Sequence, residues 1–467
     1  MMKTIRSLAI VAPSLLVLAA CTLAPKYERS TLPVADAFPN ASAATFETNA
    51  QISWKSLFVD PKLQATIDLA LKNNRDLRVA ALDITKARAQ YGIARSDLFP
   101  SLNGTVSGTR THISDLSAAA QGVPATSTGY TADLGLSWQL DIFGKVRSLS
   151  REALETFFAA QENRNAVEIG LIGDTATAWL TYAADADALR ITQQSEKTDK
   201  DTFDIATAQA RIGTVSDLDL ATFKTEYETA RQAVAQAQTK LDQDKDALVL
   251  LVGAPVGDDL LPQGLSNSLV ADNLPVGLPS QVLLNRPDVL GSEHDLKAAN
   301  ANIGAARAAF FPTISLTGAL GSSSKALGDL FKSGTGTWSY GGSVGEAIFA
   351  GGANINGVRS AKASRDIALA QYEKSIQSAF KDVSDALAVR ARIDERLDAQ
   401  TQATDAATTA FKLSQARYQN GTDSYLTLLT AERTLYTAQQ SLITLQALRA
   451  TNLVGLYQAI GGDQSLN

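Results

Sequence analysis

The sequence predicts a mixed α and β membrane protein. Three chains with four strands each would close a 12-stranded β-barrel, continuous with a long barrel of α-helices. Three observations predict this fold class. A stretch of 13 residues alternates without a break between apolar and polar side chains, and two segments of 67 residues contain no proline. The sequence also contains an internal repeat, with two halves that resemble each other. Each element therefore has a counterpart in the other structural repeat.

The first 20 residues have the pattern of a lipoprotein signal peptide. Lys3 and Arg6 precede an apolar run that is too short to remain as a membrane-spanning helix. The run ends in Leu18-Ala19-Ala20-Cys21, which is similar to a bacterial lipobox, so we expect lipidation at Cys21. Thr22 follows where Asp would favour retention in the inner membrane, which indicates the outer membrane. The alternative is an ordinary signal peptide that happens to carry a cysteine.

Composition excludes several classes of protein and site. Cys21 is the only cysteine, so one chain can form neither a disulfide nor a cysteine metal cluster. Removing the signal takes the formal charge from -6 to -8, which argues against nucleic acid as a partner. No run of about 18 apolar residues exists, so strands must supply any membrane spanning. Scattered prolines predict that the lipidated segment 21–59 is an extended strap with little regular structure.

The alternating stretch is residues 130–142, which we predict to be a barrel strand. A period of two places one set of side chains toward lipid and the other toward water. The apolar set is Tyr130, Ala132, Leu134, Leu136, Trp138, Leu140 and Ile142. A strand of a soluble sandwich would alternate in the same way, so this stretch does not decide alone.

An internal repeat divides the chain into residues 60–270 and 271–467. Residues 91–102 recur as 303–314, with Gly, Arg, Phe and Pro at a constant offset of 212. Downstream, residues 248–253 match 456–461 at an offset of 208. Between them, Ala210-Arg211-Ile212-Gly213 recurs as Ala416-Arg417-Tyr418, with Gly421 after two extra residues. Both halves are expected to carry the same order of elements.

Each half is predicted to hold a helix, two strands, a long helix, a turn and a return helix. In the first half these are about 76–99, 101–110, 130–142, 145–211 and 216–252, with a Ser-, Ala- and Gly-rich loop between the strands. In the second half they are about 286–311, 313–320, 337–348, 353–419 and 424–460. A helix of 67 residues is about 100 Å long and does not fit a compact domain. The 4-3-4 spacing of Ile376, Phe380, Val383 and Leu387 predicts a packed seam along it.

Four strands cannot close a barrel, and an open edge is not tolerated in lipid. Three chains give 12 strands, so we expect a homotrimer. Four aromatic side chains on the strands suit the membrane interface: Trp138, Trp338, Tyr130 and Tyr340. Glu346 departs from the apolar face of the fourth strand. A charge in mid-bilayer is costly, so we expect Glu346 where strand meets helix.

Enzyme and metal chemistry find little support in the sequence. Residues 341–345 match the G-x-S-x-G nucleophile pattern but lie inside a glycine-rich strand. The two histidines are His112, predicted in a loop, and His294, predicted on a helix. Neither a catalytic constellation nor a metal site follows from them, and no cofactor is expected.

The chain resembles the TolC/OprM-type outer membrane factors, and within them the NodT-like lipoproteins. The resemblance is carried by Leu278 to Val289, Ala299 to Pro312 and Leu140 to Gly144, and covers nearly the whole mature chain. It implies a trimeric, passive exit duct in the outer membrane that extends through the periplasm. Its partners would be a periplasmic adaptor and an inner-membrane resistance-nodulation-division transporter, and its cargo drugs and other small toxic compounds. The alternative is a lipid-anchored periplasmic coiled-coil protein that conducts nothing and would have no use for the paired strands.

The resemblance also assigns a site at the periplasmic tip. Gly213 and Gly421 would reverse the chain where the adaptor docks. The gate positions fall on Leu426 and Thr430, where relatives commonly carry Asp in place of Thr430. Arg433 lies on the same helix face and would pair with an acid on a neighbouring helix. The candidates are Asp217, Asp219 and Asp423, and Glu432 could add acidic character; alternatively these acids only solvate helix ends.

Overall fold

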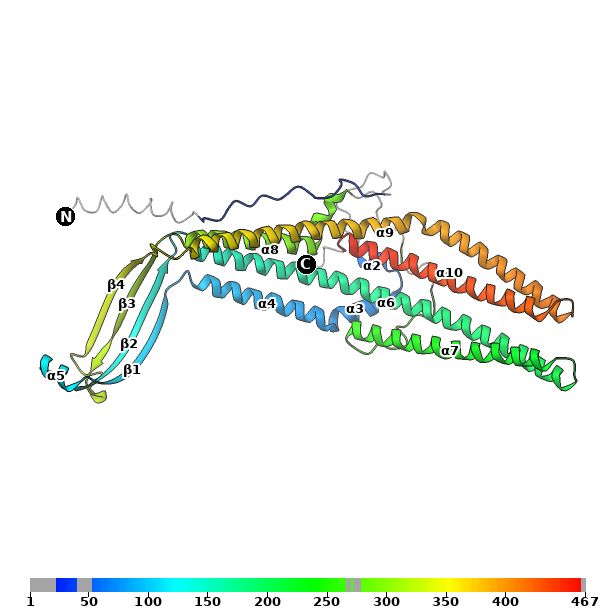
Figure 1. Cartoon of the computed structure of the whole chain (residues 1–467), viewed down its shortest axis with the longest axis horizontal. Coiled ribbons are helices and arrows are strands. Elements are labelled where there is room, and N and C mark those ends of the chain that lie inside the picture. Colours follow the sequence, from blue (N-terminus) through cyan, green and yellow to red (C-terminus); the bar gives the residue numbers. More distant parts are fainter. Residues whose placement is uncertain (1–21, 40–52, 266–269, 272–278, 463–467) are drawn as a thin grey trace. The chain divides into compact units, whose positions relative to one another are not determined.

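A computed structural model of the chain describes residues 22–39, 53–265, 270–271 and 279–462 (Figure 1). The chain divides into two compact units. The first unit contains the described residues of 22–30 together with 83–160 and 291–372, and it carries the sheet. The second contains the described residues of 31–82, 161–290 and 373–462, and it consists of helices and their connections.

The sheet of the first unit has four antiparallel strands in the order β1-β2-β3-β4. The strands are β1 (Ser101–His112), β2 (Thr126–Leu140), β3 (Thr313–Ser324) and β4 (Gly336–Gly345). β1 and β4 are the edge strands, and every residue of both is exposed in the single chain. The two open edges each carry backbone groups without a strand partner in this sheet.

The register gives the sheet one apolar and one polar face. Leu102 pairs with Leu136 and Leu134 pairs with Leu320, while Leu320 pairs in turn with Trp338. All three pairings join even-numbered residues, so the even positions of all four strands share one face. The odd positions hold almost only Ser, Thr, Asn, Gln, Asp and Gly. The alternation predicted for one strand therefore extends to the other three, except near the β1–β2 and β3–β4 connections, where the even positions are Arg110, His112, Thr126, Thr128, Ser322 and Ser324.

The predicted strand bounds are partly wrong. β1 and β3 each run further than predicted, β2 lies at 126–140 rather than 130–142, and β4 ends at Gly345 rather than at residue 348. Strands extend as far as their neighbours offer backbone partners, which the side-chain pattern does not report. His112 therefore ends β1 instead of lying in a loop, and its ring bonds Thr126 at 3.0 Å. Glu346 lies just beyond β4, outside the strand.

Short helices and prolines lead into the strand pairs. α4 (Arg75–Ser96) precedes Pro100 and β1, and α8 (Pro287–Ala308) precedes Pro312 and β3. The loop predicted between β1 and β2 contains a helix, α5 (Asp115–Gln121). Ser114 caps its N-terminus and Gly122 ends it with φ 65°. These two signals are present in the sequence and were not used in the prediction.

The long helices α6 (Lys145–Arg211) and α9 (Ala353–Gln419) have the predicted bounds. The predicted seam of α9 is buried, with Ile376, Val383 and Leu387 at most 4% exposed. Phe380 of the same seam stacks on Phe38 with ring centroids 4.8 Å apart. The return helices are α7 (Asp217–Val252) and α10 (Tyr425–Ala459).

The second unit also contains two helices that were not predicted. α2 (Trp54–Leu57) lies within the segment expected to be an extended strap, and α3 (Pro61–Asn73) follows it. Asp60 caps α3, and Pro61 occupies its first turn, where proline is tolerated. Trp54, Leu57, Phe58, Leu63 and Ile67 are at most 2% exposed, because they form part of the hydrophobic core. Two short 3-10 helices complete the description: η1 (Ser280–Asn285) and η2 (Leu327–Asp329).

Candidate functional site at the helical hairpin tips

Two helical hairpins in the second unit hold nearly all the residues that the sequence assigned to a site. In the first hairpin, Gly213 ends α6 in the left-handed conformation, with φ 75°. Its amide donates to Ala210 O at 3.0 Å, and the amide of Thr214 donates to Gln209 O at 3.1 Å. Ser216 then caps α7 by accepting from the Asp219 amide. These bonds satisfy carbonyls that the end of α6 would leave free.

The second hairpin repeats the first at a constant offset of 208. Gly421 has φ 67°, its amide donates to Tyr418 O, and the Thr422 amide donates to Arg417 O at 2.9 Å. Ser424 caps α10 by accepting from the Thr427 amide. Gln209 and Arg417 are therefore equivalent in the two turns, so the two extra residues predicted before Gly421 are not an insertion. The predicted match of Arg211 with Arg417 is wrong, because the structure makes Arg211 equivalent to Gln419.

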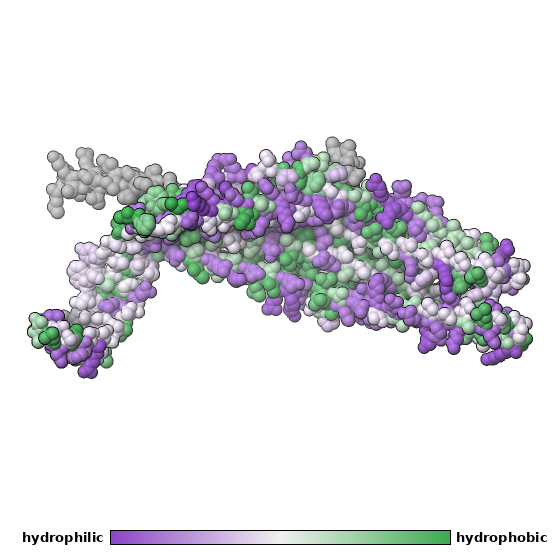
Figure 2. Space-filling model, viewed as in Figure 1, coloured by the Kyte–Doolittle hydropathy of each residue, from purple (hydrophilic) through white to green (hydrophobic). Residues whose placement is uncertain are grey.

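Leu426 and Thr430 lie on one face of the first turns of α10. Leu426 is 71% exposed, and the hydroxyl of Thr430 donates to Leu426 O at 2.7 Å. Leu218, the counterpart of Leu426 in the first hairpin, is 77% exposed. Hydrophobic residues thus appear among hydrophilic ones at the hairpin ends in Figure 2. Large exposed apolar side chains at both tips indicate a surface that another chain or partner covers.

Arg433 forms its ion pair with Glu226 of α7, at 2.6 Å. The suggested partners Asp217, Asp219 and Asp423 are therefore not the ones used in this chain. Asp423 pairs with Arg417 at 3.1 Å, and Asp219 accepts from the Ser216 hydroxyl at 2.7 Å. Asp217 belongs to the first turn of α7.

The correction has a geometric cause. α7 and α10 begin at equivalent points of the two hairpins and run in equivalent directions, so residues equally far from their starts lie at the same height. Arg433 lies eight residues into α10 and Glu226 nine residues into α7. Asp217 lies about 13 Å lower along α7 at 1.5 Å per residue. The register of α7 and α10 sets the partner of Arg433, and closeness in sequence to the hairpin turn does not.

Two further acids surround this ion pair. Burial, followed by the charge of Glu226, raises the pKa of Asp199 on α6 from 3.8 to about 6. Burial, followed by the charges of Asp199 and Glu226, raises the pKa of Glu432 from 4.5 to about 8. This raised pKa favours the protonated form of Glu432 near neutral pH, so Glu432 supplies less negative charge than was expected of it.

These residues line a pocket of about 190 Å³ between α6, α7 and α10. Aromatic rings close the tip below it, since Phe223 and Tyr425 have ring centroids 4.0 Å apart. Burial and the neighbouring carboxylates raise the pKa of Tyr425, so it stays neutral. Thr192 and Tyr436 bond across the helices at 3.0 Å. Glu226 and Asp199 were missed because nothing in the sequence reports which helices are neighbours.

The remaining predicted site features lie elsewhere. Cys21 lies outside the described residues. Residues 341–345, with the G-x-S-x-G pattern, belong to β4, and His294 of α8 bonds Glu155 at 2.8 Å. Within the described ranges, no group of three or more His, Cys, Asp and Glu could hold a metal ion. Across the same residues, no helix is both long and apolar enough to cross a membrane.

Comparison with known proteins gives a consistent result. The family model described as "Outer membrane efflux protein" matches residues 66–254 and 278–462. The probable efflux pump outer membrane protein TtgC of Pseudomonas putida is 40% identical, over 99% of this chain and 96% of its own length. The cation efflux system protein CusC of Escherichia coli is 36% identical, over 96% of each protein.

Solved structures agree. The open state of the Neisseria gonorrhoeae MtrE outer membrane channel superposes with a TM-score of 0.84 at 38% identity. The match covers 95% of this chain and 98% of that one. The Campylobacter jejuni CmeC outer membrane channel superposes with a TM-score of 0.86 at 27% identity, over 96% of each chain.

Proposed function

The chain belongs to the outer membrane efflux protein family, and from this premise we propose that three copies form the passive exit duct of a tripartite efflux pump. The chain itself is an outer membrane efflux channel, as are the relatives that it matches. A periplasmic adaptor and an inner-membrane resistance-nodulation-division transporter would complete the pump and supply its energy. The relatives and solved neighbours described above are named as channels and efflux components rather than as enzymes.

The observation that carries the proposal is the two-faced sheet with two open edges. Even positions present mostly apolar side chains and glycine, with Arg110, His112, Thr126 and Thr128 at the end of β1 and the start of β2, while odd positions present mostly polar side chains and glycine. Three copies joined from β4 of one to β1 of the next would leave no edge in the lipid, with apolar residues outside and polar residues lining a lumen. A periplasmic coiled-coil linker protein would have no use for such a sheet.

The experiment combines assembly with conduction. The full chain purified in detergent should give the mass of a trimer by native mass spectrometry, and it should form ion-conducting pores in a planar bilayer. A conducting monomer would contradict the shared barrel. A trimer without conductance would favour the linker protein.

The gate is proposed at Leu426, Thr430 and Arg433. Three copies of exposed Leu426 at a narrow axis would exclude water by apolar contact. The Arg433–Glu226 pair would hold α10 against α7 in the closed tip. Leu426→Ala should therefore widen the tip and raise conductance, whereas Leu218→Ala, at the counterpart position, should raise it less. Equal effects of the two variants would remove Leu426 from the gate.

The hairpins at Gly213 and Gly421 are proposed as the surface on which the adaptor docks. Their matched geometry offers two similar tips per chain, six in a trimer. The cargo is proposed to be drugs and other small toxic compounds, since relatives are named for antibiotic, toluene and cation efflux. In a strain lacking its own exit duct, expression of this chain should restore drug resistance. Gly213→Pro and Gly421→Pro together should abolish that resistance without loss of the trimer.

Cys21 is proposed to be acylated and to anchor the mature chain in the outer membrane. Cys21→Ser should stop incorporation of labelled palmitate. The barrel would still insert, because strand burial exceeds the contribution of one lipid anchor. Labelling that persists in the variant would end this part of the proposal.

A further inference from the structure

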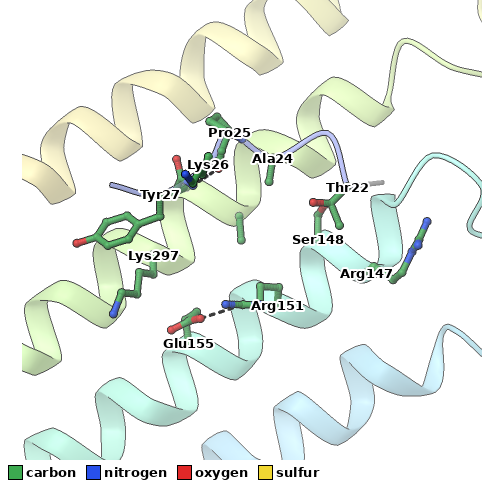
Figure 3. Close-up of a pocket in the computed structure, with 12 residues that line it drawn as sticks. Thr22, Ala24, Pro25, Lys26, Tyr27, Arg147, Ser148, Arg151, Glu155 and Lys297 are labelled. Carbon is green, nitrogen blue, oxygen red and sulfur yellow. Dashed lines mark hydrogen bonds and ion pairs between the residues drawn. The ribbon is translucent and has the colours of Figure 1, made fainter. Parts of the chain in front are cut away.

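A second pocket, of about 490 Å³, lies in the first unit between the strap and helices α6 and α8 (Figure 3). Its lining carries four cationic side chains and one carboxylate, although Lys26, Arg147 and Lys297 also pair with carboxylates just outside it. The charged side chains and the hydroxyl that line it include Lys26, Arg147, Ser148, Arg151, Glu155 and Lys297. Such a concentration of donors suits an anionic ligand rather than an apolar one.

One wall of the pocket is the strap, which α8 holds in place. Asn300 donates to Pro25 O at 2.8 Å, and Arg307 donates to Leu23 O at 2.9 Å. Further along the strap, Tyr27 and Arg29 both donate to the buried carboxylate of Glu293. Charge-assisted bonds of this kind fix backbone as well as side chains, so the pocket has a defined shape before any ligand binds.

Ser148 supplies a second and independent sign of a binding site. Its side chain is fully buried and lines the pocket, yet its hydroxyl has no hydrogen-bond partner among the described residues. Leaving a buried hydroxyl unpaired is energetically unfavourable. Gly304 makes room for this hydroxyl, because a Cβ at that position would lie 2.6 Å from it. An acceptor atom in the pocket would satisfy it.

The cations keep donors for such an acceptor. Arg151 donates through Nε to Glu155 at 2.9 Å, which leaves its two terminal nitrogens available. Lys297 has a longer ion pair, 3.4 Å, to Glu293, a carboxylate that also serves Arg29. Arg147 is more fully used, since it pairs with Asp141 at 3.1 Å and also donates to backbone carbonyls. Arg151 and Lys297 are therefore the side chains best able to bind an anion.

The position of the pocket indicates where the anion comes from. α6 begins at Lys145, five residues after β2 ends at Leu140, and Arg151 lies six residues into the helix. At 1.5 Å per residue this is about 9 Å along the helix. The polar headgroup region on each side of a bilayer is about 5–8 Å thick. If the strands span the hydrocarbon layer, Arg151 begins just beyond this region, and its long side chain can extend back to the phosphates of the adjoining leaflet.

We propose that this pocket binds the phosphate group of an anionic phospholipid headgroup and so fixes the strap at the membrane surface. The inference rests on the proposed function, because it needs the strands to lie in the outer membrane. A phosphate oxygen would accept from the Ser148 hydroxyl while Arg151 and Lys297 neutralise the charge.

The test titrates phosphatidylglycerol into the delipidated trimer and counts bound lipids by native mass spectrometry. Arg151→Gln with Lys297→Gln should weaken the tightest lipid site by about tenfold or more. Lys297→Gln alone and Ser148→Ala should each weaken it to a smaller degree. Arg359→Gln is the matched control, because Arg359 is the repeat counterpart of Arg151, is exposed on α9, and does not line the pocket. An equal loss in Arg359→Gln would mean non-specific attraction and would overturn the proposal.

Two further arms identify the ligand and separate this inference from the proposed function. Inorganic phosphate at millimolar concentration should compete only weakly, and phosphatidylcholine should bind more weakly than phosphatidylglycerol. Binding of free phosphate without binding of lipid would refute the lipid assignment. Planar-bilayer conductance is measured on the same samples. If the trimers conduct and substitution of Arg151 and Lys297 leaves lipid binding unchanged, this inference alone is overturned. If the parent chain never conducts, the result counts against the proposed function.

Discussion

Arg433 and Glu226 form a half-exposed ion pair, with side-chain exposures of 65% and 18%, between α10 and α7. Because Arg433 is largely in water, the pair contributes only about 0.5 kcal/mol per chain, the lower range for such pairs. Its importance lies in threefold repetition. Three copies add to about 1.5 kcal/mol, which is about a tenfold change in an equilibrium.

Removing this pair should loosen the closed tip. Arg433→Gln and Glu226→Gln are each expected to raise the open probability in planar bilayers by about tenfold. Arg231→Gln, which removes an exposed pair with Glu228 on the same helix, is the matched control and should change nothing. The charge exchange Arg433→Glu with Glu226→Arg should return conductance toward that of the parent. If the exchange conducts as freely as the single variants, the pair does not hold the gate.

The tip should also respond to pH through Glu432 and Asp199. Folding raises the pKa of Glu432 from 4.5 to about 8 and that of Asp199 from 3.8 to about 6. At a pH between the unfolded and the folded pKa of each group, the folded chain holds a proton that the unfolded chain has released. The free energy of unfolding therefore falls as pH rises from about 4 to 8, and it then levels off. The groups facing this cluster are Glu226 from α7, together with Arg433 and Tyr425 from α10.

Hydrogen exchange of the first turns of α10, corrected for the intrinsic rate, measures this effect. Protection should drop by about tenfold or more from pH 5 to pH 8, since one pKa unit corresponds to a factor of ten. Glu432→Gln should flatten the drop above pH 6 and make the tip better protected than the parent at pH 8. Protection that rises with pH in the parent would show that the sign is wrong.

Some of the site residues could be predicted from the sequence and others could not. Gly213 and Gly421 were predictable because a helix that reverses needs a residue tolerating positive φ, which is a local requirement. Glu226 was not, because its partner lies 207 residues away and depends on how two helices align. Leu426 was assigned only by resemblance to a family, and its exposure in one chain is consistent with a role between chains.

At the scale of elements, the long helices were predicted to the residue. The absence of proline and the glycine after each last turn define both ends locally. Strand ends were displaced because they depend on the neighbouring strand. The sequence analysis did not predict α3 and α5, although Asp60 and Ser114 cap them, because helices of 13 and 7 residues show too few turns for a clear periodic pattern.

Gly92 and Gly304 occupy equivalent positions in the two repeats, but their surroundings differ. This difference gives a test of how the strap, here residues 22–29, packs on α8. A Cβ on Gly304 of α8 would lie 2.6 Å from Ser148 Oγ and 2.8 Å from the Ala24 amide, whereas a Cβ on Gly92 of α4 would meet nothing within 4 Å. Gly304→Ala should therefore displace the strap and cost about 1–3 kcal/mol. Gly92→Ala should be neutral or stabilise by up to about 1 kcal/mol, as alanine does in a helix.

Limited proteolysis of the strap and thermal unfolding of the trimer measure the two outcomes. Cleavage in the strap should become faster in Gly304→Ala and stay at the parent rate in Gly92→Ala. Equal behaviour of the two variants would mean that the close approach of strap and helix does not exist in solution.

At the scale of the whole molecule, the central fact is that one register aligns apolar residues across four strands from both repeats. Leu102, Leu136 and Tyr340 come from three different strands. They share a face because each strand pairing joins even-numbered residues to even-numbered residues. The sequence predicted this alternation clearly only for the second strand. Glycines at Gly104, Gly318 and Gly342 interrupt the apolar set elsewhere, and only the register shows that they face neighbours with large side chains.

Even-numbered positions face one side of the sheet and odd-numbered positions the other, so introducing an arginine should have opposite outcomes at two neighbouring positions of different faces. Leu134 of β2 lies on the apolar face and Thr105 of β1 lies on the polar face, where Asp133 is its direct partner. Leu134→Arg would place a cation against lipid, at a cost of about 2–4 kcal/mol near the middle of the bilayer in each chain. Thr105→Arg would place the same cation in the lumen, opposite a carboxylate.

The first variant, Leu134→Arg, should accumulate without forming heat-resistant trimers in the outer membrane. The second should insert normally and shift the pore toward anion selectivity, as measured by the reversal potential under a salt gradient. If both variants insert equally well, the even face does not face lipid and the shared barrel is wrong.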